Sequence, residues 1–487
     1  MSSLRSLAGQ TAIYGLSSII GRLAYFLLTP LHTYVLSKGQ MGINTDIYSW
    51  IAVLTVVLTL GLETTYFRFS TRRDVSEKAI FRQTYLILFS GVLIFNILVL
   101  LLQSYILKAM RYTAHPEYLW LLMVILSGEV LATLPYARLR QQGKAMKFAL
   151  IRLTNICINI GLNLYFFLLV PYTMERGLYL PAPVNPVLGI FLANAAAVVV
   201  QLLLLAPLLK PIYTTQEPAY PLRKILRYGL PVMLAGLPGI INEVFDRQLL
   251  KYLLPPATSL EELGVYAAVF RLSVFISLFL QAFRYAAEPF FFKNADNIHA
   301  PALYARVMDI FVVLMALAVV VLSLFLPLIK YFIHNKFWEG LYILPILFSA
   351  QMLLGIIFNL NIWYKVTEKT EYGILISGTG AFANLTLNIS LIPSLGILGA
   401  SLALLVSHAT MTLVSYHLSR KHYPIPYPVS RIAANILLAT AASFVLCLSS
   451  HHWLRILVFF TTLLMLASIN KQQLIPFLKQ LKTKWNR

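Results

Sequence analysis

The sequence predicts an all-α protein that crosses a membrane many times, and its composition and its long apolar runs both predict this fold class. The 487 residues are 59% hydrophobic and 12% charged, and their mean hydropathy is +0.75. Ordinary soluble domains contain about 25% charged residues. A chain with so few charges cannot cover soluble domains with a polar surface, whereas a lipid bilayer accommodates apolar helices.

Apolar runs long enough to cross a bilayer follow one another along the chain. A transmembrane helix requires about 20 mainly apolar residues, and the sequence contains about fourteen such runs. They are expected at residues 11–33, 47–67, 79–103, 117–138, 147–170, 187–209, 225–252, 263–287, 303–329, 340–361, 371–391, 396–418, 430–448 and 453–470. The segments between them are too short to fold as separate domains.

The positive charge of the chain indicates its orientation in the membrane. The formal net charge is +21, and most of the 39 Lys and Arg residues fall in segments and helix ends that share one side with the N-terminus. Such basic segments stay in the cytoplasm and contact anionic lipid headgroups. We therefore expect both termini in the cytoplasm, and membrane lipids rather than nucleic acid as the partners of the basic residues.

No motif predicts a metal or a cofactor. Cys157 and Cys447 both lie in apolar segments, so they indicate neither a disulfide framework nor a metal site. The pair Gly143 and Lys144 lacks the upstream glycine of a phosphate-binding loop. We expect the energy source to be an H⁺ or Na⁺ gradient, the membrane potential, a substrate gradient or a partner protein.

Short patterns in the first half of the chain recur in the second half. YGL occurs at residues 14–16 and at 228–230, each time at the start of a helix interrupted by glycine and proline. MGINTDIYSWIA, after the first helix, matches ELGVYAAVFRL after the seventh. An asparagine pair in the fifth span also matches one in the eleventh: Asn155 with Asn159, and Asn384 with Asn388. These matches predict an internal duplication, which is common in transporters.

Three charges interrupt the apolar run at residues 239–256. Glu243 and Arg247 are four residues apart with the acid first, which is the favourable order for an ion pair on one helix. Asp246 beside them makes the cluster net negative. A charge at mid-bilayer costs at least ~2.5 kcal/mol, so such residues usually face a cavity or the protein interior. The cluster therefore either neutralises itself inside the helix bundle or lines a cavity.

Other polar residues also fall inside predicted spans. Arg22, part of a polar stripe in the first helix, and Arg271 in the eighth have no acid one turn away, so each faces a cavity or bonds to another helix. Four acids are candidates for ion coupling or for charge pairing: Glu63, Glu129, Glu243 and Asp246. The matching asparagines are expected to join helices by hydrogen bonds, and sugar contact is the alternative.

Four segments resemble the bacterial polysaccharide flippases of the O-antigen or Wzx type. The segments are TAIYGLSSIIGRLAYFLLTPLHTYVLSKGQMG, GLETTYFRF, ELGVYAAVFRL and NLTLNISLIPSLGILGASLA. These flippases belong to the multidrug/oligosaccharidyl-lipid/polysaccharide exporter (MOP) superfamily. The resemblance extends from about residue 8 to about residue 420.

The resemblance implies two pseudo-symmetric six-helix lobes around a central cavity, followed by two further helices. On this basis we expect the first lobe at residues 1–214 and the second at residues 215–424. The last two helices and a basic cytoplasmic tail are expected at residues 425–487. The resemblance also implies rocking between inward-open and outward-open forms in a bacterial inner membrane.

The implied function is transport rather than catalysis. The implied cargo is an oligosaccharide on a polyprenyl pyrophosphate, moved from the cytoplasmic to the outer leaflet. Such flippases have a cationic cavity, and by position the residues that would bind substrate are Arg22, Arg247 and Arg271. The implied partners include the polysaccharide polymerase and the glycosyltransferases of the same pathway.

Other functions predict different features. A MATE-type cation-coupled drug antiporter, from the same superfamily, would have acid-dominated lobes. A flippase for the peptidoglycan lipid intermediate would differ in its cargo. A membrane glycosyltransferase or polymerase would need a catalytic loop outside the membrane, whereas the outer segments SKGQMGINTD and IPSLG are short and poor in acids. A scaffold without transport gives no reason for unpaired arginines inside spans.

Overall fold

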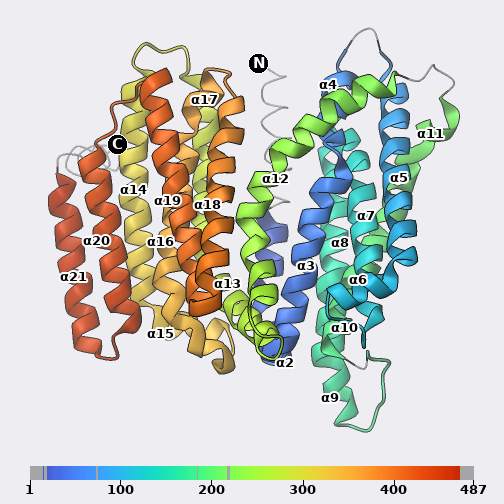
Figure 1. Ribbon diagram of the computed structural model, residues 1–487, viewed down its shortest axis with the longest axis horizontal. Coiled ribbons are helices and arrows are strands. Elements are labelled where there is room, and N and C mark those ends of the chain that lie inside the picture. Colours follow the sequence, from blue (N-terminus) through green and yellow to red (C-terminus); the bar gives the residue numbers. More distant parts are fainter. Residues whose placement is uncertain (1–14, 16–18, 73–74, 184, 216–219, 472–487) are drawn as a thin grey trace, which may run out of the picture. The chain divides into compact units, whose positions relative to one another are not determined.

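The computed structural model describes residues 15, 19–72, 75–183, 185–215 and 220–471 (Figure 1). Within these ranges the chain forms helices joined by short connections, with no strand. Thirteen of the described helices are long and apolar enough to cross a membrane. The first predicted span, at residues 11–33, lies partly outside the described residues. The prediction of an all-α polytopic membrane protein is confirmed.

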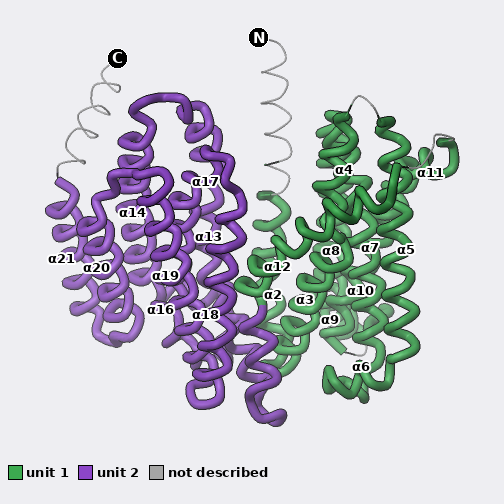
Figure 2. Tube along the Cα trace, turned by 45° about the horizontal axis from the view of Figure 1, so that its top comes forward, with its two compact units in different colours: residues 1–244 green, residues 245–487 purple. Residues whose placement is uncertain are grey.

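Contacts between helices divide the chain into two compact units, unit 1 at residues 1–244 and unit 2 at residues 245–487 (Figure 2). The division falls inside helix α12 (Leu222–Leu253). The lobe boundaries expected at residues 214 and 424 stay predictions, because unit 2 includes the last two helices together with the second lobe.

Unit 1 is built around α7 and α10. Its helices are α2 (Thr29–Val35), α3 (Lys38–Thr59), α4 (Leu62–Ser70), α5 (Glu77–Leu101), α6 (Gln103–Ala109), α7 (Pro116–Gln141), α8 (Ala145–Leu164), the π-helix η1 (Tyr165–Leu169), α9 (Val170–Met174), α10 (Pro186–Leu205), η2 (Ala206–Leu209) and α11 (Lys210–Thr214). Residues 19–27 are also helical. α10 packs against α7 and α8, and α7 packs against α3 and α5.

Unit 2 is built around α16 and α19. Its helices are α13 (Ser259–Lys293), α14 (Ala300–Leu324), α15 (Leu326–Ile329), η3 (Lys330–Phe332), η4 (Asn335–Ile343), α16 (Leu344–Leu360), α17 (Ile362–Val366), α18 (Glu371–Leu395), α19 (Ile397–His422), α20 (Val429–Leu448) and α21 (His452–Ile469). α19 packs against α16 and α18, and α16 packs against α13 and α14. α20 and α21 pack on each other and on α14.

The two units repeat one packing pattern. In unit 1 the sixth span, α10, contacts the fourth and fifth, α7 and α8; in unit 2 the twelfth span, α19, contacts the tenth and eleventh, α16 and α18. The fourth span also contacts the second and third, α3 and α5, as the tenth contacts the eighth and ninth, α13 and α14. Because equivalent helices pack together in both halves, the structure supports the internal duplication predicted from the sequence.

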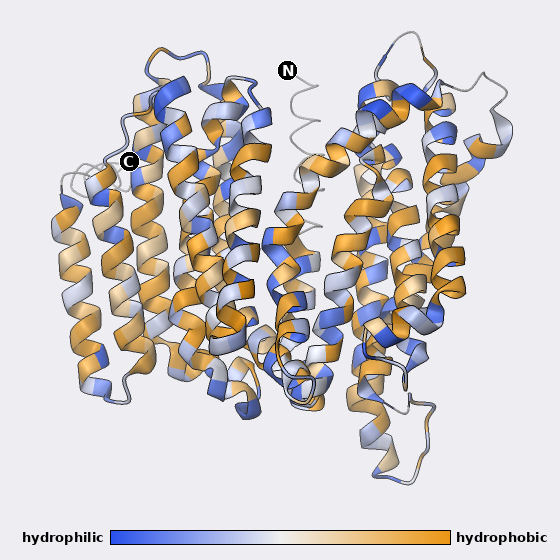
Figure 3. Ribbon diagram, viewed as in Figure 1, coloured by the Kyte–Doolittle hydropathy of each residue, from blue (hydrophilic) through white to orange (hydrophobic). Residues whose placement is uncertain are grey.

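Apolar residues predominate along the helices of both units (Figure 3), and many large apolar side chains are exposed. Leu101 of α5 is 74% exposed and Leu437 of α20 is 70% exposed, as examples from each unit. Soluble monomers rarely expose large contiguous apolar patches, so lipid tails are the expected cover. The prediction of a multi-pass membrane protein agrees with this surface.

One segment expected to be an outer loop is helical. α3 begins at Lys38, so SKGQMGINTD forms its first turns. A capping box explains the early start: the Gln40 backbone N–H donates to Ser37 Oγ at 3.2 Å, and the Ser37 N–H donates to Gln40 Oε1 at 2.9 Å. Asp46 is consequently buried inside unit 1, where it accepts a 2.7 Å hydrogen bond from Tyr112.

The second span is interrupted where α12 approaches it. Leu60 and Gly61 have positive φ angles of 49° and 64°, which end α3 and start α4. Gly229 of α12 lies against this interruption, since a Cβ there would be 2.6 Å from the Leu60 carbonyl oxygen. Glycine permits this backbone contact. α12 stays helical through Pro231 and Pro238 and bends along its course (Figure 1).

Candidate functional site

The first described helical turns place Arg22 and Tyr25 three residues apart, on one face. Tyr25 donates a 3.3 Å hydrogen bond to Asn155 Oδ1 of α8. Gly21 packs against α8 as well, because a Cβ at this position would lie 2.8 Å from Cδ1 of Ile156. Arg22 is exposed on unit 1 and forms no ion pair within the described part of the chain.

A chain of polar contacts continues along α8. Asn163, which is fully buried, donates to the backbone oxygen of Asn159 at 2.8 Å and to its Oδ1 at 3.0 Å. Its own Oδ1 lies 2.8 Å from Nε2 of His32 in α2. These bonds join α2 to α8, which is the helix-joining role expected for the asparagines of this span.

Glu129 lies near the middle of α7 and is exposed on unit 1. It interacts electrostatically with Arg152, two turns into α8, and Arg152 also interacts with Tyr25 and Tyr136. Glu129, Arg152, Tyr25 and Asn155 therefore form one group, which we call the Glu129 cluster. An acid inside a membrane helix is a suitable place for a proton or cation to bind, and the positive charge of Arg152 would favour release of that ion.

Sequence reasoning missed Arg152 because it lies close to a helix end predicted to be cytoplasmic. It was counted among the basic residues that orient the chain. A polar stripe could have identified it: Arg152, Asn155, Asn159 and Asn163 follow at spacings of three and four residues, so they lie on one face of α8.

The two other candidate acids of unit 1 differ in their surroundings. Glu63 of α4 forms an ion pair with Arg140 of α7, and both side chains are about one-third exposed. Glu243 of α12 is exposed and forms no ion pair with the described residues. The favourable spacing of Glu243 and Arg247 is therefore not used for an ion pair in this structure.

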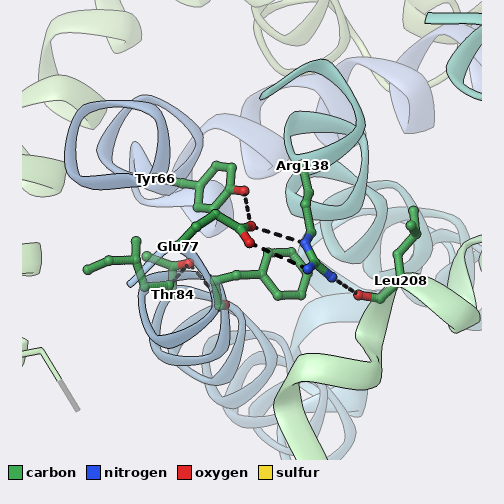
Figure 4. Close-up of polar contacts among 7 residues, drawn as sticks. Tyr66, Glu77, Thr84, Arg138 and Leu208 are labelled. Atoms are coloured by element: carbon green, nitrogen blue, oxygen red, sulfur yellow. Dashed lines mark hydrogen bonds and ion pairs between the residues drawn. The ribbon is translucent and has the colours of Figure 1, made fainter. Parts of the chain in front are cut away.

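A deeper ion pair lies in unit 1, between two residues that the sequence did not suggest as partners. Arg138 Nε lies 3.0 Å from Glu77 Oε1, and the Arg138 guanidinium also donates to the Leu208 carbonyl oxygen at 2.6 Å (Figure 4). Tyr66 donates a 2.5 Å hydrogen bond to the same carboxylate. Arg138 is only 7% exposed, so this pair joins α4, α5, α7 and η2 rather than facing a substrate.

In unit 2 two residues of the charged stretch, Asp246 and Arg247, lie against aromatic rings of α13. Asp246, 1% exposed, accepts hydrogen bonds from the Tyr266 hydroxyl and, at 2.8 Å, from the Arg247 backbone N–H. The Arg247 guanidinium carbon lies 4.9 Å from the centre of the Phe270 ring, within range of a cation–π interaction. Arg271 comes directly after Phe270 in α13 and is partly buried.

The asparagine pair of unit 2 repeats the bond seen in unit 1. Asn388 donates to the Asn384 backbone oxygen at 2.8 Å and to its Oδ1 at 2.7 Å, and both are buried in α18. The equivalent pair in α8 is Asn159 and Asn163. The expected match with Asn155 and Asn159 is therefore one turn out of register, because the sequence pattern alone fits either pair.

Comparison with known proteins identifies the chain at the level of its family. A profile of the family described as "Polysaccharide biosynthesis protein" matches residues 7–295, which is more than half of the chain. The chain belongs to this family. No match emerged from a comparison with curated protein sequences.

Solved structures show the same fold. The lipid II flippase MurJ, in an inward closed conformation, superposes with a TM-score of 0.64 at 15% identity, covering 96% of this chain and 99% of that chain. A multidrug resistance MATE family transporter of the MOP superfamily, in an inward-facing conformation, gives a TM-score of 0.55 at 18% identity, covering 85% and 94%. The polysaccharide biosynthesis protein thus has the MOP-type fold that its sequence predicted.

Proposed function

We propose that this polysaccharide biosynthesis protein is a flippase that moves an oligosaccharide on polyprenyl pyrophosphate from the cytoplasmic to the outer leaflet by alternating access. The observation that carries the proposal is the exposed guanidinium of Arg22, in an apolar helix and without an ion pair in the described part of the chain. A charge in such a helix requires water or an anion beside it.

The chemistry of the cargo fits this arginine. A pyrophosphate cannot cross hydrocarbon unaided, because its charges and the sugar hydroxyls would lose water without replacement. Arginine donates paired hydrogen bonds to phosphate oxygens, and it stays charged. We propose that Arg22, Arg247 and Arg271 bind the pyrophosphate in turn while the polyprenyl tail stays in lipid.

Two energy sources fit the proposed transport. A membrane potential of 100 mV, negative inside, favours outward movement of an anion by ~2.3 kcal/mol per charge. The Glu129 cluster offers a binding place for H⁺ or Na⁺, so we propose ion coupling there as a second source. From the distribution of basic residues we propose that both termini lie in the cytoplasm of a bacterium. The glycosyltransferases that make the cargo would act there, and a polysaccharide polymerase would receive the cargo outside.

Export by arginine variants tests the proposal. Arg22 and Arg271 are replaced individually by alanine and by lysine in a strain that lacks the chromosomal gene, and surface glycan is measured at matched protein levels. Loss of a charge-assisted hydrogen bond of about 1.5–3 kcal/mol predicts a reduction of roughly tenfold or more for alanine, with partial recovery for lysine. Arg176→Ala, on the predicted outer side, is the control and is expected to export normally.

The outcomes separate the competing functions. Full export by both alanine variants would show that Arg22 and Arg271 are not needed to bind the substrate. Rescue of a strain depleted of its peptidoglycan flippase would assign the other lipid-linked cargo. Cation-dependent drug resistance without glycan export would instead indicate an antiporter.

A further inference from the structure

A second polar site lies in unit 2, away from the residues assigned above. A pocket there is lined by residues of α13, α16 and α17, among them Phe283, Arg284, Glu288, Phe358, Asn359 and Lys365. Arg284 follows Arg271 by almost four turns of α13, or about 20 Å along the helix. The basic residues predict that this end of α13 faces the cytoplasm, where a lipid-linked substrate would first meet the protein.

The charges of the pocket leave one arginine able to bind an anion. Lys365 Nζ lies 2.6 Å from Glu288 Oε1, a hydrogen-bonded ion pair. Arg284 Nε lies 3.7 Å from Glu288 Oε2, which is too long for a hydrogen bond. The Arg284 side chain is 48% exposed, and its guanidinium carbon lies 4.8 Å from the Phe358 ring centre. Two cations share one carboxylate, so the pocket is net positive and the donors of Arg284 remain accessible.

Asn359 gives the pocket a buried hydrogen-bond acceptor that a ligand could satisfy. It is 3% exposed, and its amide donates to the Gly355 carbonyl oxygen at 3.2 Å. Its Oδ1 is buried and accepts no hydrogen bond from any described residue. A buried acceptor without a partner costs about 1–3 kcal/mol, so a ligand group that donates to this oxygen would be stabilised.

The size of the pocket limits what can reach Asn359. Its accessible volume is about 20 Å³, enough for one group of the size of water. A phosphate oxygen of that size is an acceptor and cannot satisfy Asn359 Oδ1. A hydroxyl group can donate to it, while the Phe358 ring offers an apolar wall for the sugar ring that carries the hydroxyl. The pocket therefore suits a ligand that joins an anion to a sugar.

We propose that the junction between the pyrophosphate and the first sugar of the lipid-linked substrate binds at the opening of this pocket, as an entry site on the cytoplasmic side, with only one sugar hydroxyl entering the pocket. Arg284 donates to the pyrophosphate, and one hydroxyl of the first sugar donates to Asn359 Oδ1. Glu288 holds Lys365 in place. The inference rests on the proposed flippase function and assigns a residue that recognises sugar as distinct from phosphate.

Binding of two matched probes tests the inference. The full chain in lipid nanodiscs is titrated with farnesyl pyrophosphate and with farnesyl pyrophosphate linked to N-acetylglucosamine. One hydrogen bond of about 1 kcal/mol predicts roughly fivefold tighter binding of the sugar-bearing probe. Asn359→Leu is expected to abolish that advantage, whereas Arg284→Ala is expected to weaken both probes about tenfold. Lys293→Ala is the control, because exposed Lys293 lies on the opposite face of α13 from Arg284.

Photocrosslinking inside the pocket is a second measurement, which separates a lost contact from a variant that folds poorly. With Phe358 replaced by the photoreactive p-benzoylphenylalanine, the sugar-bearing probe should crosslink, and Arg284→Ala should reduce the yield. The same replacement at Phe325, at the far end of α14, should give no crosslink. Equal binding of both probes to the wild-type chain, or an unchanged preference in Asn359→Leu, would overturn the inference.

The flippase proposal can fail separately. If the chain exports glycan, but Phe358 gives no crosslink and Asn359→Leu keeps the sugar preference, the entry site is wrong while the proposed function stands. If the wild-type chain neither exports glycan nor binds either probe, the proposed function fails and the entry site fails with it.

Discussion

Asn388 donates a 2.7 Å hydrogen bond to the side-chain oxygen of Asn384, one turn earlier in α18. Asn163 makes the corresponding 3.0 Å bond to Asn159 in α8. The surroundings differ, because Asn163 Oδ1 lies 2.8 Å from the His32 ring, whereas Asn388 Oδ1 is buried with no hydrogen-bond partner among the described residues. One inherited motif thus joins two helices in unit 1 and stays within one helix in unit 2.

This difference predicts unequal effects of the same substitution. Asn163→Leu should lower the free energy of unfolding by about 1–3 kcal/mol, because it leaves the His32 ring nitrogen without its partner. Asn388→Leu should lower the free energy of unfolding by less, since it also removes a buried oxygen that accepts no hydrogen bond from any described residue. Thermal unfolding in detergent, followed by intrinsic fluorescence, measures both variants. Equal losses would contradict the different roles assigned to the two asparagines.

The ion pair of Arg138 and Glu77 should be important for the stability of unit 1. Arg138→Met leaves the Glu77 carboxylate, whose side chain is 21% exposed, without its cation, and the cost should approach that of breaking a fully buried pair, about 3–5 kcal/mol. We expect a large fall in the yield of monodisperse protein, measured by size-exclusion chromatography of a fluorescent fusion. Arg140→Met is the matched control, because its pair with Glu63 is partly exposed and should contribute about 1 kcal/mol or less.

The sequence was sufficient to predict the fold class and most membrane spans, because the bilayer requires long apolar helices whatever their packing. It also predicted that Asn384 and Asn388 repeat an asparagine pair of the first half, although the pair with the same hydrogen bonds is Asn159 and Asn163. It misassigned SKGQMGINTD as a loop, although the Ser37 and Gln40 capping box was readable, because the polar residues of that segment concealed the helix start.

The surroundings of individual charges could not be read from the sequence. Asp246 was expected either to neutralise Arg247 or to line a cavity with it, and nothing in the local sequence indicated that its carboxylate accepts a hydrogen bond from Tyr266, twenty residues away on another helix. Glu77 and Arg138 are 61 residues apart, and their pairing depends on how α5 and α7 pack. Local spacing predicts only partners on the same helix, whereas these partners are brought together by tertiary packing.

The contact between α12 and the interruption of the second span should tolerate no side chain at residue 229. Gly229→Ala would gain up to about 1 kcal/mol of helix propensity, but its Cβ would lie 2.6 Å from the Leu60 carbonyl oxygen. Because this neighbour is backbone, we expect net destabilisation and reduced export. Gly239→Ala, on the same helix with no atom within 4 Å of the new Cβ, should be neutral or stabilising. Unfolding temperature and surface glycan measure both variants.

Glu129 provides the test of ion coupling. Glu129→Gln keeps the size of the side chain but removes the charge beside Arg152, so the Glu129 cluster can no longer exchange a proton or hold a cation. In proteoliposomes we expect the wild-type flipping rate to rise with an imposed H⁺ or Na⁺ gradient, and the variant to lose that rise while still responding to membrane potential. Glu175→Gln, in the exposed segment after α9, should behave as wild type. A Glu129→Gln variant that keeps its full response to the gradient would exclude this acid as the coupling site. If the wild-type chain responds neither to ion gradients nor to the membrane potential, the driving force must be the substrate gradient or a partner protein.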